Sequence, residues 1–186
     1  PLQDNRKYNI RVTADDAAGN VLTPPSPTAV RYDITEPKSN VTSPADGAFI
    51  NKLGSVAGTA EDPNSDPSGV KATQIRIQRN ADSYYWTGSI WSGGEAWLAD
   101  EGGTTWTRNT QLPPSNNTAD GLEDGKLYAV KSRSYDVAGN TQSVLLSGSS
   151  FRFDVSSPTA YALQPENNRR YNKLAEINGT AIDAYN

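Results

Sequence analysis

Short stretches in which apolar and polar residues alternate recur along the chain and predict β-strands. The strictest alternation is QIRIQ (74–78), and LYAVKSRSYD (127–136) follows a similar two-residue period. GSVAGTA (54–60) alternates small residues with Val56, and SSFRFDV (149–155) has the composition of a closing strand. Runs rich in Gly, Pro, Asn and Asp separate these segments, so the pattern predicts many short strands and no helix.

All four tryptophans lie in one segment, residues 83–107, with the sequence SYYWTGSIWSGGEAWLADEGGTTWT. The pairs Thr87–Gly88, Gly93–Gly94 and Gly102–Gly103 predict hairpin turns within it. With the flanking segments this makes seven or more short strands. That number favours an all-β fold, an antiparallel sandwich of two sheets.

An internal repeat organises the chain. YNIRVTADDAAGN (8–20) and YAVKSRSYDVAGN (128–140) match at a constant offset, and further identities follow one residue out of step. The matched positions are Tyr8, Asp16, Ala18, Gly19 and Asn20 with Tyr128, Asp136, Ala138, Gly139 and Asn140, then Asp33, Pro37, Pro44, Asn51, Lys52, Leu53, Gly58, Thr59, Ala60 and Asp62 with Asp154, Pro158, Pro165, Asn172, Lys173, Leu174, Gly179, Thr180, Ala181 and Asp183. We therefore expect a tandem array in which 1–36 are the C-terminal strands of a preceding repeat, 37–157 a complete repeat and 158–186 the N-terminal strands of a following repeat.

Composition narrows the classes of function. The chain contains neither His nor Cys, which removes the commonest general base and the imidazole and thiolate metal ligands. Its formal net charge of −4 comes without a basic stripe, which argues against a nucleic-acid partner. No apolar run approaches the ~20 residues of a membrane span. Acidic groups such as Glu123 and Asp124, or Glu95 and Asp100, lie in turn-rich segments with no sign of a cleft, so we expect no enzymatic activity.

A resemblance to known repeats adds to this interpretation. The pattern L-x-D-G-x-x-Y-x-V followed by D-x-A-G-N resembles the second-last strand of fibronectin-type-III and bacterial immunoglobulin-like repeats. Here it consists of Leu122, Asp124, Gly125, Tyr128 and Val130, then Asp136 to Asn140. GTAED…SGV, YYW and WL also resemble repeats of very large bacterial surface proteins, and the resemblance covers essentially the whole chain. It implies an immunoglobulin-like sandwich, a tyrosine corner at Tyr128 and an extracellular or cell-surface location.

Acidic loops supply candidate metal ligands. In such a sandwich the loop after the second strand, the loop before the last strand and the linker from the preceding repeat meet at one end. The residues gathered there are Asp33, Glu36, Glu61, Asp62, Asp66, Asp136 and Asn140. Ca²⁺ takes six to eight oxygen ligands of these kinds, and such an ion would stiffen the joint between repeats. The alternative is that these residues only form turns, in which Asp and Asn bond their own backbone.

The aromatic cluster also has two interpretations. Its members are Tyr84, Tyr85, Trp86, Trp91, Trp97 and Trp106. They either fill the core and the hairpins, which we favour, or present a face to a surface glycan or a protein. The function we expect is a structural spacer, a stalk or fibre segment of an adhesin-like surface protein, with neighbouring repeats or copies of itself as partners. The alternative is a carbohydrate- or protein-binding module that uses the Trp-rich hairpins 84–106.

Overall fold

The computed structural model describes residues 1–23, 26–64 and 67–185, with only the backbone given for 99–101. Strands joined by turns and loops occur along the whole described chain. The strands are β1 (Arg6–Ile10), β2 (Thr28–Tyr32), β3 (Lys38–Ser43), β4 (Ala48–Ile50), β5 (Val56–Glu61), β6 (Val70–Arg79), β7 (Tyr84–Trp86), β8 (Trp91–Ser92), β9 (Leu98–Glu101), β10 (Thr105–Arg108), β11 (Leu127–Asp136), β12 (Ser149–Phe153), β13 (Thr159–Gln164) and β14 (Asn178–Ile182). The prediction of an all-β fold is confirmed. No helix long and apolar enough to cross a membrane occurs in the described ranges.

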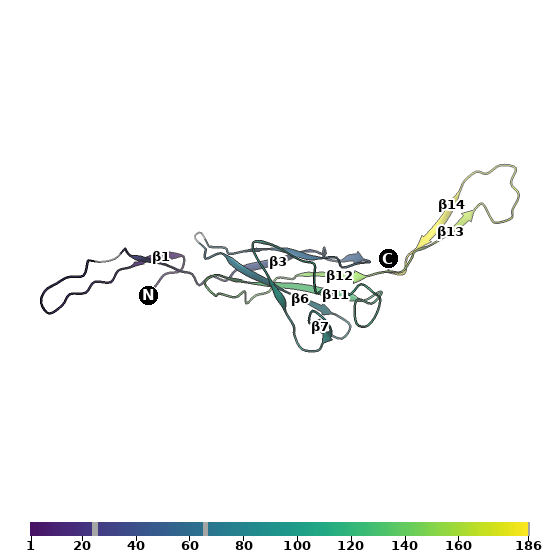
Figure 1. Ribbon diagram of the computed structural model, residues 1–186. Coiled ribbons are helices and arrows are strands. Elements are labelled where there is room, and N and C mark those ends of the chain that lie inside the picture. Colours follow the sequence, from purple (N-terminus) through teal and green to yellow (C-terminus); the bar gives the residue numbers. More distant parts are fainter. Residues whose placement is uncertain (24–25, 65–66, 186) are drawn as a thin grey trace.

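Strands β3 to β12 form a sandwich-like body of two sheets. The smaller sheet has the order β10-β5-β3, and the larger sheet has the order β4-β12-β11-β6-β7-β8, with β9 also pairing with β6. Every pair is antiparallel except β4 with β12. Two-stranded sheets, β1-β2 and β13-β14, extend from opposite ends of this body (Figure 1).

The two-residue alternation that predicts the strands also decides which side chains enter the core. Ile75 and Ile77 of β6 and Val130 of β11 are fully buried between the sheets, whereas the residues between them face outward. From the smaller sheet, Val56 and Trp106 close the core against them. Trp106 fits because its ring lies directly over Gly58, the residue opposite it on β5.

Only one of the three predicted hairpin turns joins paired strands. The turn at Thr87–Gly88 connects β7 to β8, which pair with each other. Gly93–Gly94 lies between β8 and β9, and Gly102–Gly103 lies between β9 and β10, and neither pair of strands is hydrogen-bonded as neighbours. Because β9 pairs with β6 and β10 pairs with β5, the second of these turns carries the chain from one sheet to the other. The prediction of hairpins at these two sites is wrong.

The end hairpins repeat the pairings of the central body. Tyr8 lies opposite Val30 in β1-β2, as Tyr128 lies opposite Phe151 in β11-β12. The register of β13 with β14 likewise matches that of β3 with β5. Neither hairpin is covered by a second sheet within the described residues, so most of its side chains are exposed.

Candidate functional site

Three carboxylates meet at the end of the body that receives the chain from β2. They belong to Asp33 in the linker after β2, Asp62 just after β5 and Asp136 at the end of β11, and one oxygen of each lies within 4.8 Å of the others. We call these residues the acidic triad. Asp33 is 7% exposed and Asp136 is fully buried. No Lys or Arg in the described chain forms an ion pair with them, so no paired positive charge offsets their mutual repulsion.

Asp136 is held by the turn that follows it. Its Oδ1 accepts hydrogen bonds from the backbone N–H groups of Gly139 (2.7 Å) and Asn140 (2.8 Å), and its Oδ2 accepts one from the Asn140 amide (2.8 Å). Gly139 has a φ of 101°, which a residue with a side chain rarely adopts. The same Asn140 amide donates to the backbone carbonyl of Asp33 (3.1 Å), which ties the turn to the linker.

Asp33 is held by the loop after β5. Its Oδ1 accepts a hydrogen bond from the Asn64 amide (2.8 Å) and one from the backbone of Thr35 (3.1 Å), and its Oδ2 accepts one from the backbone of Ser68 (2.8 Å). Asn64 and Ser68 are site residues that the sequence analysis did not name. They lie in the turn-rich run EDPNSDPSG, where only the acidic residues drew attention.

Asp62 is the least satisfied member of the acidic triad. Its Oδ2 accepts hydrogen bonds from the backbone of Gly69 (2.9 Å) and from the Ser68 hydroxyl (3.3 Å). Its Oδ1 is buried and has no hydrogen-bond partner among the described residues, and the same is true of Oδ1 of Asp183, one period later. A buried charged oxygen without a partner is costly, so a cation at this position would stabilise the site.

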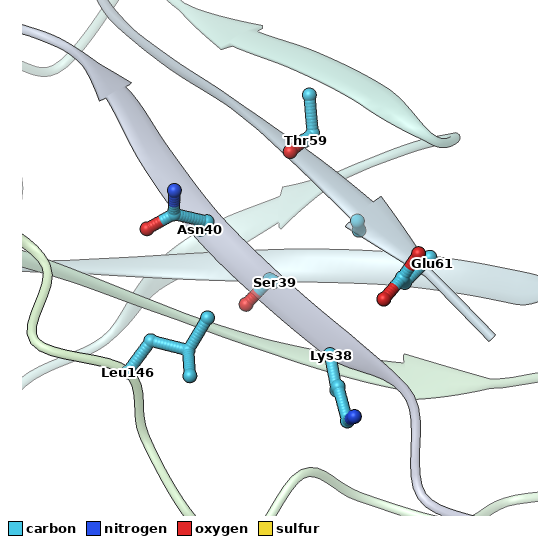
Figure 2. Close-up of a pocket in the computed structure, with 7 residues that line it drawn as sticks. Lys38, Ser39, Asn40, Thr59, Glu61 and Leu146 are labelled. Atoms are coloured by element: carbon cyan, nitrogen blue, oxygen red, sulfur yellow. The ribbon is translucent and has the colours of Figure 1, made fainter. Parts of the chain in front are cut away.

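Two of the remaining predicted ligands, Glu36 and Glu61, lie apart from this cluster. Glu36 turns to the neighbouring loop, where its Oε2 accepts hydrogen bonds from the backbone (2.7 Å) and hydroxyl (2.6 Å) of Ser143, and these bonds lower the pKa of the Glu36 carboxyl, the hydroxyl contributing most. Glu61 points outward at the end of β5, beside a cavity of about 170 Å³ that Lys38 and Leu146 also line (Figure 2). That cavity is smaller than the few hundred Å³ typical of a ligand site. Asp66 lies outside the described residues.

The linker is also held from its preceding side. Oδ1 of Asp4 accepts a hydrogen bond from the backbone of Ile34 (2.8 Å), and Oδ2 accepts one from the Thr35 hydroxyl (2.6 Å). The Thr35 hydroxyl and then the Ile34 amide lower the pKa of Asp4, so the carboxylate is charged at neutral pH. Ile34 and Thr35 therefore bond to the segment that precedes the linker. Asp33 and Glu36 bond to loops of the body that follows it.

The second linker is held in the same way. Oδ1 of Asp124 accepts a hydrogen bond from the backbone of Val155 (2.8 Å), and Oδ2 accepts one from the Ser156 hydroxyl (2.7 Å). The Tyr185 hydroxyl donates a further bond to Oδ2 (3.1 Å). The Val155 amide and then the Ser156 hydroxyl lower the pKa of Asp124. Asp124 follows Asp4 by one repeat offset, so the two linkers share one bonding pattern.

The aromatic cluster is divided between the core and the outer face of the larger sheet. Trp86 and Trp106 are each 2% exposed and belong to the core, so neither offers a ring face to a ligand. Trp91 is half-buried and packs against the core, and its indole donates to the carbonyl of Gly121 (2.9 Å). Tyr84 is 41% exposed. Packing in the core therefore accounts for Trp86, Trp91 and Trp106.

The other two members, Tyr85 and Trp97, lie on the outer face of the larger sheet beside arginine side chains. Tyr85 pairs with Gln78 of β6, and Trp97 immediately precedes Leu98, which is buried opposite Ile75. Side chains alternate along a strand, which places both rings outside.

The tyrosine corner implied by the resemblance is formed. Tyr128 is fully buried, and its hydroxyl accepts a hydrogen bond from the backbone of Glu123 five residues earlier (2.8 Å). Tyr8 accepts the equivalent bond from Gln3 (2.7 Å). Burial raises the pKa of Tyr128.

No model of a known protein family matches this chain, and no curated protein matches it. The class that the fold defines is an all-β, sandwich-like protein.

Proposed function

We propose that this chain is a rigid spacer, a segment of a stalk or fibre built from tandem immunoglobulin-like repeats of a large extracellular surface protein. The bonding of the first linker carries the proposal. Ile34 and Thr35 bond to Asp4 on the preceding side, whereas Asp33 and Glu36 bond to loops of the following body. A linker fixed on both sides resists bending, which a spacer requires and a flexible tether does not.

Three further observations support a repeating unit. Asp124 holds the second linker as Asp4 holds the first. The hairpin β1-β2 pairs as β11-β12 does, and β13-β14 pairs as β3-β5 does. The turn at Asp16 has the same bonds to Asn20 as the turn at Asp136 has to Asn140. In such an array the free energy of unfolding is approximately a sum of one contribution from each repeat and one from each interface between neighbouring repeats. The array can therefore grow longer without a new fold.

A Ca²⁺ ion in the acidic triad is the second part of the proposal. The donors are all oxygens, from carboxylates and the nearby Asn64 and Ser68 side chains, and hard cations such as Ca²⁺ prefer this set. The ion would pair with the free Oδ1 of Asp62 and offset the repulsion between three crowded carboxylates. Because Asp33 belongs to the linker and Asp62 and Asp136 to the body, the ion would also lock the joint.

Thermal unfolding of the full chain tests the ion. The melting temperature is measured in excess EDTA and then in millimolar Ca²⁺, for the wild type, Asp62→Asn and the exposed control Asp120→Asn. We expect Ca²⁺ to raise the melting temperature of the wild type and of the control but not of Asp62→Asn. In EDTA, Asp62→Asn should be the most stable of the three, since one of three repelling charges is gone. A wild type that does not respond to Ca²⁺ would overturn the ion and leave the spacer proposal standing.

Small-angle X-ray scattering tests the spacer separately. In EDTA, the wild type should give a narrow, extended distribution of interatomic distances. A variant with both Asp4→Ala and Asp124→Ala should give a broader one, because both linkers lose their bonds to the preceding side. A wild type as broadly distributed as this variant would contradict the spacer role.

A further inference from the structure

Basic side chains cluster at outward positions of the larger sheet, although the whole chain carries a formal net charge of −4. Outward positions on three adjacent strands carry Arg76 (β6), Lys131 and Arg133 (β11) and Arg152 (β12), and we call this set the arginine face. Of these four, Arg76 is paired with a carboxylate, Glu95. Among the described residues no acidic partner is found for the other three.

The register places like charges side by side. Arg76 and Lys131 are direct cross-strand partners on β6 and β11. Like charges in this position repel and destabilise a sheet. Arg133, two residues further along β11, turns its Nε and Nη2 groups to Oε1 of Gln74 (2.9 and 2.7 Å), a neutral acceptor, and no carboxylate among the described side chains pairs with it. The face therefore gains from an external anion.

Aromatic rings orient the guanidinium groups. The Arg133 guanidinium carbon lies 4.2 Å from the centre of a Trp97 ring, and that of Arg76 lies 5.2 Å from it. Arg76 also lies 5.3 Å from the centre of Tyr85. Such cation–π contacts restrict the side chains, so less conformational entropy is lost when they bind a ligand. The contacts with Arg76 and Arg133 account for the position of Trp97, which is half-buried on the outer face of the sheet.

Guanidinium groups held in place bind carboxylates and sulfates through paired hydrogen bonds. Lys131 and Arg133 project from the same side of β11 about 7 Å apart, in line with its axis. Cations spaced along a strand fit an extended polymer with regularly spaced anionic groups better than a small molecule. Nucleic acid fits less well, because single strands bind largely by stacking bases on open aromatic rings, whereas the rings on this face, Tyr85 and Trp97, already lie against guanidinium groups.

We propose that the arginine face binds an acidic polysaccharide, with carboxylate or sulfate groups of the sugar chain lying along Lys131 and Arg133. These residues lie in mid-strand, away from both linkers, so the face stays accessible in a stalk of successive repeats. Binding here does not depend on the spacer role. Of the aromatic cluster, Tyr85 and Trp97 are the members that lie against these arginines.

Binding of the full chain to immobilised polygalacturonate, heparin and neutral dextran tests the proposal. The variant Lys131→Gln/Arg133→Gln removes two charges from the face, and the control Lys38→Gln/Lys52→Gln removes two exposed charges elsewhere. We expect the wild type and the control to bind at least one acidic polymer and not dextran, and the first variant to bind about tenfold more weakly or worse. Equal melting temperatures show that both variants are folded.

Several outcomes would overturn the proposal. One is wild-type protein that binds neither acidic polymer at about 50 mM NaCl, where charge attraction is strong. Others are undiminished binding by the first variant, or an equal loss in the control, which would indicate unspecific attraction. Equally tight binding of single-stranded DNA would overturn the choice of a polysaccharide and indicate a nucleic-acid partner. If only heparin binds, the partner is sulfated, and if only polygalacturonate binds, it is a carboxylated chain.

Discussion

Thr35 donates its hydroxyl hydrogen bond to Oδ2 of Asp4 across 2.6 Å, and Ser156 makes the same bond to Asp124 across 2.7 Å. In each pair the hydroxyl belongs to a linker and the carboxylate belongs to the segment before it. The bond fixes the direction in which the chain leaves one unit and enters the next. The two linkers therefore share this bond to the segment that precedes them.

Replacing Asp124 by alanine should loosen the second linker without melting the central body. The change removes the acceptor for the Val155 amide and the Ser156 hydroxyl, but no core contact. We expect unchanged melting of the body, together with faster hydrogen exchange and larger picosecond-to-nanosecond motion of the Val155 amide, measured by NMR. The exposed control Asp120→Ala should leave this amide as it is in the wild type. Equal exchange rates in all three proteins would refute a holding role for Asp124.

The same linker should be sensitive to acid. Hydrogen bonds from Val155 and then Ser156 lower the pKa of Asp124, so the folded value lies below the unfolded value of about 3.9. The contribution of this carboxylate to the stability of the linker is then complete above the unfolded pKa, and it is lost as the pH falls through the lower, folded pKa. The amide chemical shift of Val155 should stay constant between about pH 7 and 5 and change below about pH 4. A transition centred above pH 5 would contradict this assignment.

Glycine at position 58 should be essential for the fold. A Cβ at this position would collide with the carbonyl of Asn40 and with the ring of Trp106, which packs on Gly58 from the neighbouring strand. Overpacking of this kind costs about 1–3 kcal/mol or more, so Gly58→Ala should lower the free energy of unfolding by at least that amount in urea titrations. Gly54→Ala is the matched control, since nothing lies within 4 Å of its Cβ position, and it should unfold as the wild type does.

Tyr128→Phe should destabilise the body although the ring is kept. The lost hydroxyl leaves the backbone N–H of Glu123 without its acceptor beside a buried ring. We expect the free energy of unfolding to fall by about 1–3 kcal/mol. Tyr84→Phe serves as the control, because Tyr84 is 41% exposed, and its hydroxyl has no hydrogen-bond partner in the described chain. Equal unfolding curves for the two variants would show that the tyrosine corner contributes nothing.

Much of the strand pattern could be predicted from local sequence. Ile75 and Ile77 alternate with polar residues and are buried as expected, since successive side chains of a strand point to opposite faces. The meeting of Asp33, Asp62 and Asp136 also followed from placing their loops at one end of a sandwich. The hairpins expected at Gly93–Gly94 and Gly102–Gly103 are absent, because a glycine pair signals a turn but not the strand with which the chain pairs next.

The sequence by itself indicated several of the strands and which residues within each of them share a face, since alternation depends on local backbone geometry. Only the tertiary structure decided which face lies inside. It placed Trp106 over Gly58 in the core and Trp97 outside between two arginines, although both are tryptophans of the same segment. That choice depends on register and on packing between residues far apart in the chain, because one step in register exchanges the two faces of a strand.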